Sequence, residues 1–279
     1  MTSEKLVVAA IQISSASDIQ RNIELAEMLI DQAVDEGAQL VLLPENFAQI
    51  PSSKIKRQQA YEAIGSGPIQ EFLATKSEQK SIYLVAGSVA IASEHSHKAF
   101  SASLCFDPNG DLLARYNKIH LFDVRLPGGK NYAESDSFEY GELSSNGGLF
   151  STPWGTFCLT ICYDLRFPEL FRQVIDQDII GYLVPAAFTY DTGSAHWETL
   201  LRARAIENLS FVIASNQVGV HPNGLQSWGH SMVLDPWGTI LGQQEIGEGA
   251  VLATLDISRQ RELRREFPCL KHRRIKRFG

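Results

Sequence analysis

A strand–helix–strand pattern at the start of the chain restricts the fold more than any other feature. Residues 5–13, KLVVAAIQI, form an almost continuous apolar run, which is typical of a parallel-sheet strand covered on both faces. Ser17 or Asp18 can cap a helix that follows, and its apolar residues keep to one stripe until Gly37 offers a left-handed stop. The run QLVLLPEN comes directly after that helix. A crossover of this length predicts two parallel strands with the helix outside the sheet.

The rest of the chain contains further strand and helix patterns. Strands are predicted near residues 81–91, 99–107, 111–118, 155–162, 179–185, 210–216, 229–235 and 249–255, and helices near 56–78, 165–177, 193–208 and 258–266. Two segments, 104–116 and 232–244, place an Asp-Pro-x-Gly turn between apolar strands, which predicts two β-hairpins. Parallel units combined with antiparallel hairpins favour an α/β sandwich of two mixed sheets with outer helices.

Length and composition favour one large globular unit. The 279 residues allow two small domains or one α/β unit, and no Pro-, Ser- or Gly-rich linker separates two halves. We therefore expect a single domain over residues 1–279, with a basic C-terminal tail at 261–279. No apolar stretch is long enough for a membrane helix, and the N-terminus lacks a signal-peptide pattern. These features predict a cytoplasmic protein without a membrane partner.

The net charge of −7 is unevenly distributed. Residues 261–279 contain eight Lys and Arg against two Glu, a balance of +6, which leaves −13 on the other 260 residues. An acidic body of this kind argues against a nucleic-acid partner. The tail alone could be a nucleic-acid or membrane patch, but we favour a chain end that crosses a subunit interface or pairs with the acidic body.

Three reactive side chains follow buried apolar runs. Glu45 follows VLLP, Lys118 follows LLARYN and Cys162 follows FCLTI. Ligands of open α/β sheets lie beyond the carboxyl ends of the strands, so the fold can bring these residues together. Glu45 or Lys118 alone would also suit a solvated surface. Cys162 is different, because a strand-to-helix elbow places N–H groups beside its thiol, whereas Cys105 and Cys158 lie within strand patterns.

Together, these residue types suit hydrolysis of an amide or a nitrile through a thioester. A free cysteine with a pKa of about 8.5 is only partly thiolate at neutral pH, so it needs a base or positive neighbours. Glu45 can accept the thiol proton of Cys162. Lys118 can stabilise the thiolate and then the oxyanion of a tetrahedral intermediate, assisted by the backbone N–H of Tyr163.

Three sequence segments closely resemble the catalytic boxes of the nitrilase superfamily of carbon-nitrogen hydrolases, in the same order. They are LLPENF around Glu45, YNKIHLFD around Lys118 and ICYDLRFPEL around Cys162. The resemblance covers nearly the whole chain. It implies an α-β-β-α sandwich, a Glu-Lys-Cys triad, no metal or organic cofactor, and a homodimer or higher homo-oligomer. It also implies that Glu134, in PGGKNYAES, holds the lysine and orients the substrate, although this residue alone would also suit a loop carboxylate.

The downstream segments indicate a branch of the superfamily. Residues 186–208, 227–241 and the ending LRREFPCLKHRR resemble small Nit-type amidases, especially the branch that hydrolyses deaminated glutathione. The omega-amidases, which act on 2-oxoglutaramate, share AHWE and DPWG with this chain. The resemblance implies release of 2-oxoglutarate and Cys-Gly from deaminated glutathione. The alternative is an omega-amidase, or hydrolysis of another small carboxylate-bearing amide.

Three further residues are candidates for contact with such a substrate. Arg166 lies one helical turn after Cys162 and can offer a bidentate guanidinium to an oxo-acid carboxylate. Phe188 and Thr192, at the end of the LVPAAF strand and in its loop, would complete the wall. Alternatively, Arg166 forms a salt bridge at the elbow and the other two pack in a loop. Loops near 50–57, 125–140 and 219–227 are expected to set the shape of the pocket.

Other interpretations are compatible with the same residues. His120 or His196 could serve a Cys-His hydrolase, although we favour hydrogen-bonded structural roles for both. The seven histidines show no HxxxH or HExxH spacing, which gives a metal hydrolase little support. A non-catalytic scaffold could keep the same fold, but a scaffold does not need three reactive groups at strand ends.

Overall fold

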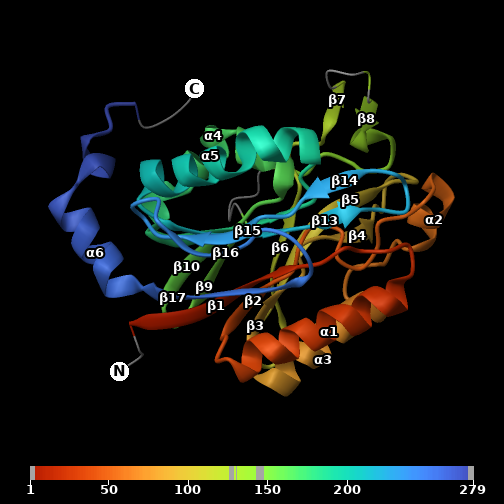
Figure 1. Cartoon of the computed structure of the whole chain (residues 1–279), viewed down its shortest axis with the longest axis horizontal. Coiled ribbons are helices and arrows are strands. Elements are labelled where there is room, and N and C mark those ends of the chain that lie inside the picture. The colour runs from red at the N-terminus through yellow and green to blue at the C-terminus, as the bar shows by residue number, and fades with distance from the viewer. Residues whose placement is uncertain (1–3, 126–128, 130, 143–147, 276–279) are drawn as a thin grey trace.

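Two β-sheets face each other at the centre of the molecule (Figure 1). The computed structural model describes residues 4–125, 129, 131–142 and 148–275. In spatial order, the first sheet contains β17 (Gly249–Asp256), β1 (Lys5–Gln12), β2 (Leu40–Leu42), β3 (Tyr83–Val85), β5 (Ala99–Phe106) and β4 (Val89–Ala92), with β6 (Leu112–Asn117) paired to β5. The second contains β16 (Ile240–Gln244), β15 (Ser231–Leu234), β12 (Phe211–Asn216), β11 (Ile179–Ala186), β10 (Gly155–Leu159) and β9 (Leu149–Thr152). Parallel pairs such as β1–β2 and antiparallel pairs such as β12–β15 confirm the predicted mixed sheets.

Helices cover the outer face of each sheet (Figure 1). The first sheet is covered by α1 (Ile19–Asp35) and α3 (Pro68–Lys80), and the second by α4 (Pro168–Gln173) and α5 (Tyr190–Asn208). A further helix, α6 (Ile257–Glu266), follows β17. This arrangement confirms the expected α-β-β-α sandwich. Within the described part of the chain, no helix has the length and apolarity needed to cross a membrane.

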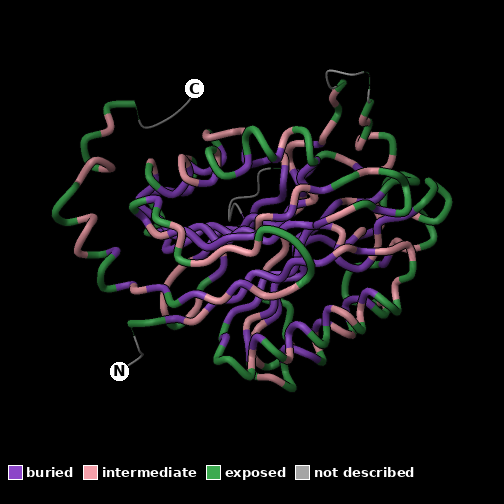
Figure 2. The backbone as a smooth tube through the Cα atoms, in the orientation of Figure 1, coloured by how far each residue is buried: buried purple, intermediate pink, exposed green. Residues whose placement is uncertain are grey.

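Strand β1 explains why the first apolar run has no polar face. Leu6 and Val8 belong to the core between the two sheets, whereas Ala9 and Ile11 belong to the core under α1 and α3. Both faces of β1 are therefore buried, as the continuous purple centre of Figure 2 illustrates. β17 pairs antiparallel with β1 along its whole length, so strands from the two ends of the described chain lie side by side.

The predicted helix over 56–78 is wrong, because two helices occupy this region. The first is α2 (Lys54–Gln59) and the second is α3. Between them, Gly65 and Gly67 have φ values of +76° and +122°, which a continuous α-helix does not allow. The carboxylate of Glu62 then caps α3 by accepting hydrogen bonds from two N–H groups of its first turn, at 2.7 and 3.3 Å.

The predicted strand over 81–91 is also interrupted. It divides into β3 and β4 at Gly87, which has a φ of +67°. A Cβ atom at this glycine would lie 2.1 Å from the carbonyl oxygen of Pro44, so the chain can turn there only without a side chain. The turn brings the chain past the end of β2, next to the segment that carries Glu45.

The predicted helix over 165–177 is replaced by shorter elements. A 3₁₀ turn, η2 (Cys162–Arg166), precedes α4, and a second 3₁₀ turn, η3 (Ile175–Gln177), follows it. Pro168 separates η2 from α4, because the residue before a proline avoids the helical conformation. The structure also contains strands that the sequence patterns did not predict: β9 and four strands of three residues, β7 (Asp123–Arg125), β8 (Asn131–Ala133), β13 (Val218–Val220) and β14 (Gln226–Trp228).

Both predicted hairpins are present and have the same turn. They are β5–β6 and β15–β16, one in each sheet. The carboxylate of Asp107 accepts hydrogen bonds from the N–H groups two and four residues later, at 2.8 and 3.1 Å. Asp235 makes the same two contacts at 2.9 and 2.8 Å. These contacts explain the shared Asp-Pro-x-Gly pattern in chemical terms.

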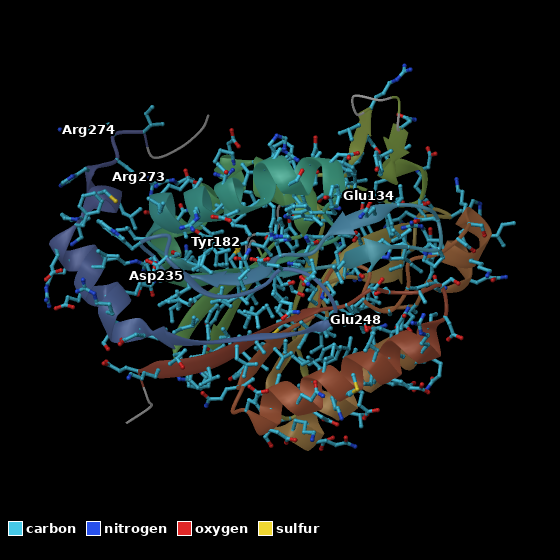
Figure 3. The ribbon with its side chains drawn as sticks, in the orientation of Figure 1. Glu134, Tyr182, Asp235, Glu248, Arg273 and Arg274 are labelled. Carbon is cyan, nitrogen blue, oxygen red and sulfur yellow. The ribbon has the colours of Figure 1, made fainter. Side chains whose placement is uncertain are left out.

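The described part of the basic tail packs against the body of the same chain. Arg264 donates a hydrogen bond to the carboxylate of Asp178 at 2.8 Å, and Arg273 donates to Asp176 at 3.1 Å. The last four residues of the predicted tail lie outside the described residues. In Figure 3, Arg273 lies at the opposite side of the molecule from Glu134. This segment therefore lies away from the pocket of its own chain.

Candidate active site

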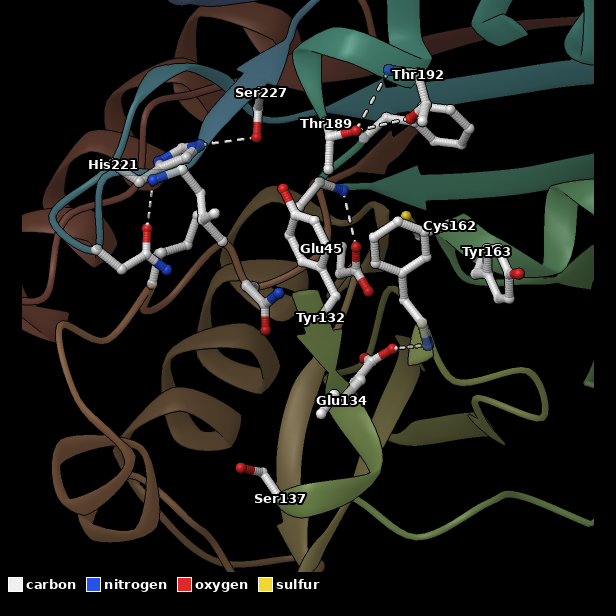
Figure 4. Close-up of a pocket in the computed structure, with 18 of the residues that line it drawn as sticks. Glu45, Tyr132, Glu134, Ser137, Cys162, Tyr163, Thr189, Thr192, His221 and Ser227 are labelled. Carbon is white, nitrogen blue, oxygen red and sulfur yellow. Dashed lines mark hydrogen bonds between the residues drawn. The ribbon is translucent and has the colours of Figure 1, made fainter. Parts of the chain in front are cut away.

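The three reactive residues that follow buried strands meet at one cavity. Glu45 follows β2 and Lys118 follows β6 of the first sheet, whereas Cys162 follows β10 of the second. A cavity of about 300 Å³ opens where these strand ends meet, and all three residues line it together with Glu134 (Figure 4). The structure therefore brings together the residues that the strand-end argument predicted to meet.

A buried ion cluster forms one side of the cavity. The Nζ atom of Lys118 lies 2.7 Å from Oε1 of Glu45, and 3.0 and 2.9 Å from the two carboxylate oxygens of Glu134. Backbone groups orient both carboxylates, since Glu45 accepts from the Ala187 N–H at 2.8 Å and Glu134 accepts from the Phe122 N–H at 2.7 Å. The first of these contacts joins the two sheets. The lysine is thus held by two fixed anions.

Burial and charge set the resting protonation states of this cluster. Burial alone would lower the pKa of Lys118, but the negative charges of Glu134 and Glu45 outweigh it and hold that pKa well above its ordinary value of 10.5. Burial and the charge of Glu45 raise the pKa of the Cys162 thiol well above 9.0, although Lys118 acts in the opposite direction. Lys118 is therefore an ammonium and Cys162 a thiol at neutral pH, so the nucleophile needs a base.

The backbone at Cys162 is a strained elbow. Its φ of +47° lies in the left-handed region, which few residues other than glycine adopt. The next turn is fixed by Asp164, whose fully buried carboxylate accepts from the Ile161 N–H at 2.9 Å and from the Tyr116 hydroxyl at 2.8 Å. Its other oxygen accepts from the N–H of His120 at 3.2 Å. These bonds tie the elbow to β6 and to the segment after it.

Replacing Asp164 with asparagine should destabilise this elbow. The amide NH₂ would face donors that the carboxylate now accepts from, so we expect a loss of about 1–3 kcal/mol in the free energy of unfolding, together with a lower kcat. Urea titration and steady-state kinetics measure the two effects. Asp235→Asn is the matched control, because Asp235 also accepts from backbone N–H groups but lies in a hairpin turn away from the cavity. Equal, small effects of both changes would contradict this role of Asp164.

The candidate substrate-contact residues also line the cavity. Tyr163, Arg166, Phe188 and Thr192 are all part of its wall. The guanidinium carbon of Arg166 lies 5.2 Å from the ring centre of Phe188 and 5.9 Å from that of Tyr163. The Oγ1 atoms of Thr192 and Thr189 lie 2.7 Å apart. The guanidinium of Arg166 also lies 3.4 Å from Nδ1 of His196, and it has further N–H groups to offer to an anion.

Comparison with known proteins adds an independent observation. The sequence profile of the family described as carbon-nitrogen hydrolase matches residues 7–265. The chain belongs to the carbon-nitrogen hydrolase family. It is 41% identical to the deaminated glutathione amidase of Synechocystis, over 96% of this chain and 97% of that protein. It is 34% identical to human omega-amidase, over 98% of this chain and 96% of that one. Nit3 of Saccharomyces cerevisiae, of the nitrilase superfamily, matches in structure with a TM-score of 0.86, 30% identity and 98% coverage of both chains.

The two histidines considered for a Cys-His pair lie elsewhere in this carbon-nitrogen hydrolase. Among the described residues that line the cavity, neither His120 nor His196 is present. The Nδ1 atom of His120 lies 2.7 Å from Asp164, and its ring stacks on Phe167 with centres 3.7 Å apart. The Nδ1 atom of His196 lies 3.4 Å from the guanidinium of Arg166. These contacts agree with the hydrogen-bonded roles favoured from the sequence.

The three loops expected to shape the pocket contribute residues to its wall that the sequence did not single out. Arg57, Tyr132 and His221 line the cavity from the regions near 50–57, 125–140 and 219–227; residues 126–128 and 130 lie outside the described residues. The Nε2 atom of His221 lies 2.8 Å from Oγ of Ser227, and burial lowers the pKa of this histidine. Across the described ranges, no group of three or more His, Cys, Asp and Glu residues is placed to hold a metal ion.

Proposed function

We propose that this carbon-nitrogen hydrolase is a thiol amidohydrolase that cleaves deaminated glutathione to 2-oxoglutarate and Cys-Gly. The observation that carries the proposal is the buried Glu45–Lys118–Glu134 ion cluster in the same cavity as Cys162. A carboxylate base, a fixed ammonium and a protonated thiol are the groups that acyl transfer through a thioester requires. The identity to a deaminated glutathione amidase over nearly the whole chain supports the substrate.

In the first half of the reaction, Glu45 accepts the proton of the Cys162 thiol as the sulfur attacks the amide carbonyl. The ammonium of Lys118 and the backbone N–H of Tyr163 stabilise the negative charge on the carbonyl oxygen. Glu45 then gives its proton to the amide nitrogen, the C–N bond breaks, and Cys-Gly leaves as the free amine. The 2-oxoglutaryl group stays on the sulfur as a thioester.

In the second half, water replaces the amine. Glu45 removes a proton from this water as it attacks the thioester carbonyl, and the same two donors stabilise the new oxyanion. The C–S bond breaks, the sulfur regains a proton and 2-oxoglutarate leaves. Glu134 is a positioning residue in this scheme, because it binds the Lys118 ammonium through both carboxylate oxygens, in addition to Glu45, and thereby fixes it.

Arg166 is proposed to bind the carboxylate of the 2-oxo acid. Arg166→Gln should lower kcat/KM by about 10- to 100-fold for 2-oxoglutaramate, since a charge-assisted hydrogen bond is lost. An uncharged aliphatic amide of similar length is the matched substrate, and we expect a change of no more than about threefold for it, because it lacks the lost contact. Steady-state kinetics measure both. Equal losses on the two substrates would remove Arg166 from carboxylate recognition.

The alternative is an omega-amidase, which the similarity to human omega-amidase supports. Rates of the purified protein on deaminated glutathione and on 2-oxoglutaramate separate the two proposals. Preference for deaminated glutathione supports the first, and preference for 2-oxoglutaramate leaves the chemistry intact but changes the substrate. If neither substrate is hydrolysed, the result would favour the third interpretation, a non-catalytic scaffold with the same fold. The expected homo-oligomer and the cytoplasmic location stay predictions.

A further inference from the structure

The positively charged side chains that line the cavity outnumber the negatively charged ones. Among the described residues, two carboxylates line it, Glu45 and Glu134, against three cations, Lys118, Arg57 and Arg166. Lys118 is already bonded to both carboxylates. The two arginines are therefore left without a carboxylate of the cavity, in a protein whose overall charge is −7. A pocket with two such arginines suits a ligand that carries two negative charges.

Arg57 is directed inward by its helix. It is the only residue of α2 (Lys54–Gln59) that is not exposed. Its guanidinium carbon lies 5.2 Å from the ring centre of Phe138, which is itself buried. Within the described part of the chain, the Arg57 side chain makes no hydrogen bond or ion pair to another residue. Burial lowers its pKa, and the charges of Glu134, Tyr61 and Glu45 act in the opposite direction. An aromatic platform leaves the N–H edge of a guanidinium free for a carboxylate.

The two arginines approach the cavity from different walls. Arg166 belongs to the 3₁₀ turn η2, which follows β10 of the second sheet, and contacts Phe188 and Tyr163. Arg57 belongs to α2, beyond the first sheet, and lies over Phe138. The partners of the two guanidinium groups do not overlap. Each arginine is therefore held by its own set of contacts, which suits recognition of two separate anionic groups.

We propose that Arg57 binds a second carboxylate of the substrate, on the leaving-group side of the scissile amide, and thereby selects amides with an anionic leaving group. The inference rests on the proposed function, in which Arg166 holds the 2-oxo-acid carboxylate. Deaminated glutathione has a second carboxylate at the glycine of its Cys-Gly leaving group. 2-Oxoglutaramate has none, because it releases ammonia. Arg57 would therefore separate these two substrates within one catalytic apparatus.

The test combines enzyme variants with matched substrates. Arg57→Gln, Arg57→Lys and the control Lys56→Gln are assayed on deaminated glutathione, on its C-terminal carboxamide and on 2-oxoglutaramate. Lys56 is the neighbouring cation of the same helix and is exposed, so its replacement removes one charge without changing the cavity. Circular dichroism checks that each variant is folded. The carboxamide substrate differs from deaminated glutathione only in that its C-terminal group is uncharged.

We expect Arg57→Gln to lower kcat/KM for deaminated glutathione by about 10- to 100-fold, mainly through a higher KM. The other two substrates should change by no more than about threefold, because they lack the carboxylate that the arginine binds. Arg57→Lys should recover part of the loss, since it restores the charge but not the bidentate geometry. The wild type should itself prefer deaminated glutathione to the carboxamide by a factor similar to the Arg57→Gln effect.

Two results would overturn the inference. Equal losses on all three substrates would mean that Arg57 acts through Glu134 or Glu45 and not on the leaving group. An Arg57→Gln variant that matches Lys56→Gln on every substrate would mean that it has no role. Failure of the proposed function would give a different result, seen in the wild type: good hydrolysis of 2-oxoglutaramate and poor hydrolysis of deaminated glutathione. In that case the substrate has no second carboxylate for Arg57 to bind, and the inference fails as well.

Discussion

Cys162→Ala is expected to abolish turnover while the protein stays folded. The thiol supplies the bond that carries the acyl group, and no neighbouring group can replace it, so kcat should fall by about 10⁴-fold or more. Stability should change little, because alanine tolerates the φ of +47° as poorly as cysteine does and only one sulfur atom is lost. Steady-state kinetics and thermal unfolding of the same preparation measure both effects.

Cys158→Ala is the matched control for this change. Cys158 lies in β10, four residues before Cys162, and is buried in the core between the sheets. It does not line the cavity. We expect the opposite result, a loss of about 1 kcal/mol in the free energy of unfolding from the cavity that the missing sulfur leaves, with normal turnover. An active Cys162→Ala variant would remove the nucleophile from the proposed mechanism.

Lys118→Met should remove activity and also destabilise the fold. Methionine has a similar length but no charge, so it would leave Glu45 and Glu134 buried beside each other without a cation. Breaking a buried ion pair in this way costs about 3–5 kcal/mol, which urea titration measures as a lower free energy of unfolding. The raised pKa of Lys118 means that its stabilising effect is complete below pH 10.5 and is lost only as the pH rises through the higher folded value. Burial and the charge of Glu45 raise the pKa of Glu134, so the deficit of the variant should shrink at low pH, where Glu134 becomes protonated and its negative charge is lost.

Lys76→Met is the control for the stability effect. Lys76 is almost as buried as Lys118, and its Nζ atom lies 2.8 Å from both Glu27 and Asp31. Those two side chains are 49% and 37% exposed, so water can solvate them once the lysine is gone. We expect a loss of about 1 kcal/mol or less. Similar losses for the two lysines would contradict the view that the anions of the cavity depend on Lys118.

The sequence predicted the elements whose pattern is local and long. The strand β1, the helix α1 and both Asp-Pro-x-Gly hairpins have enough residues to show a period or a defined turn chemistry. The prediction of one helix over 56–78 was wrong because Gly65 and Gly67 interrupt an otherwise helical pattern. The cap that Glu62 provides for α3 depends on contacts made only in the folded chain. Strands of three residues, such as β7 and β13, are too short to show any period.

The same distinction applies to the cavity. Glu45, Lys118 and Cys162 follow apolar runs, so the general position of ligands at strand ends was enough to group them. Arg57 carries no such signal, because its inward direction depends on how the helices α2 and α3 are separated. His221 is similar, since its partner Ser227 comes from the short β14. These residues could be assigned only once the loops were placed.

The most direct test of the account is to find the acyl group during turnover. The wild-type protein is mixed with deaminated glutathione, quenched in acid in the steady state, digested and mapped by mass spectrometry. We predict a 2-oxoglutaryl thioester on Cys162, located by fragmentation of the peptide that contains both Cys158 and Cys162, and none on Cys158 or Cys105. Turnover with an adduct on another residue, or with Cys162 unmodified at every quench time, would contradict the central claim.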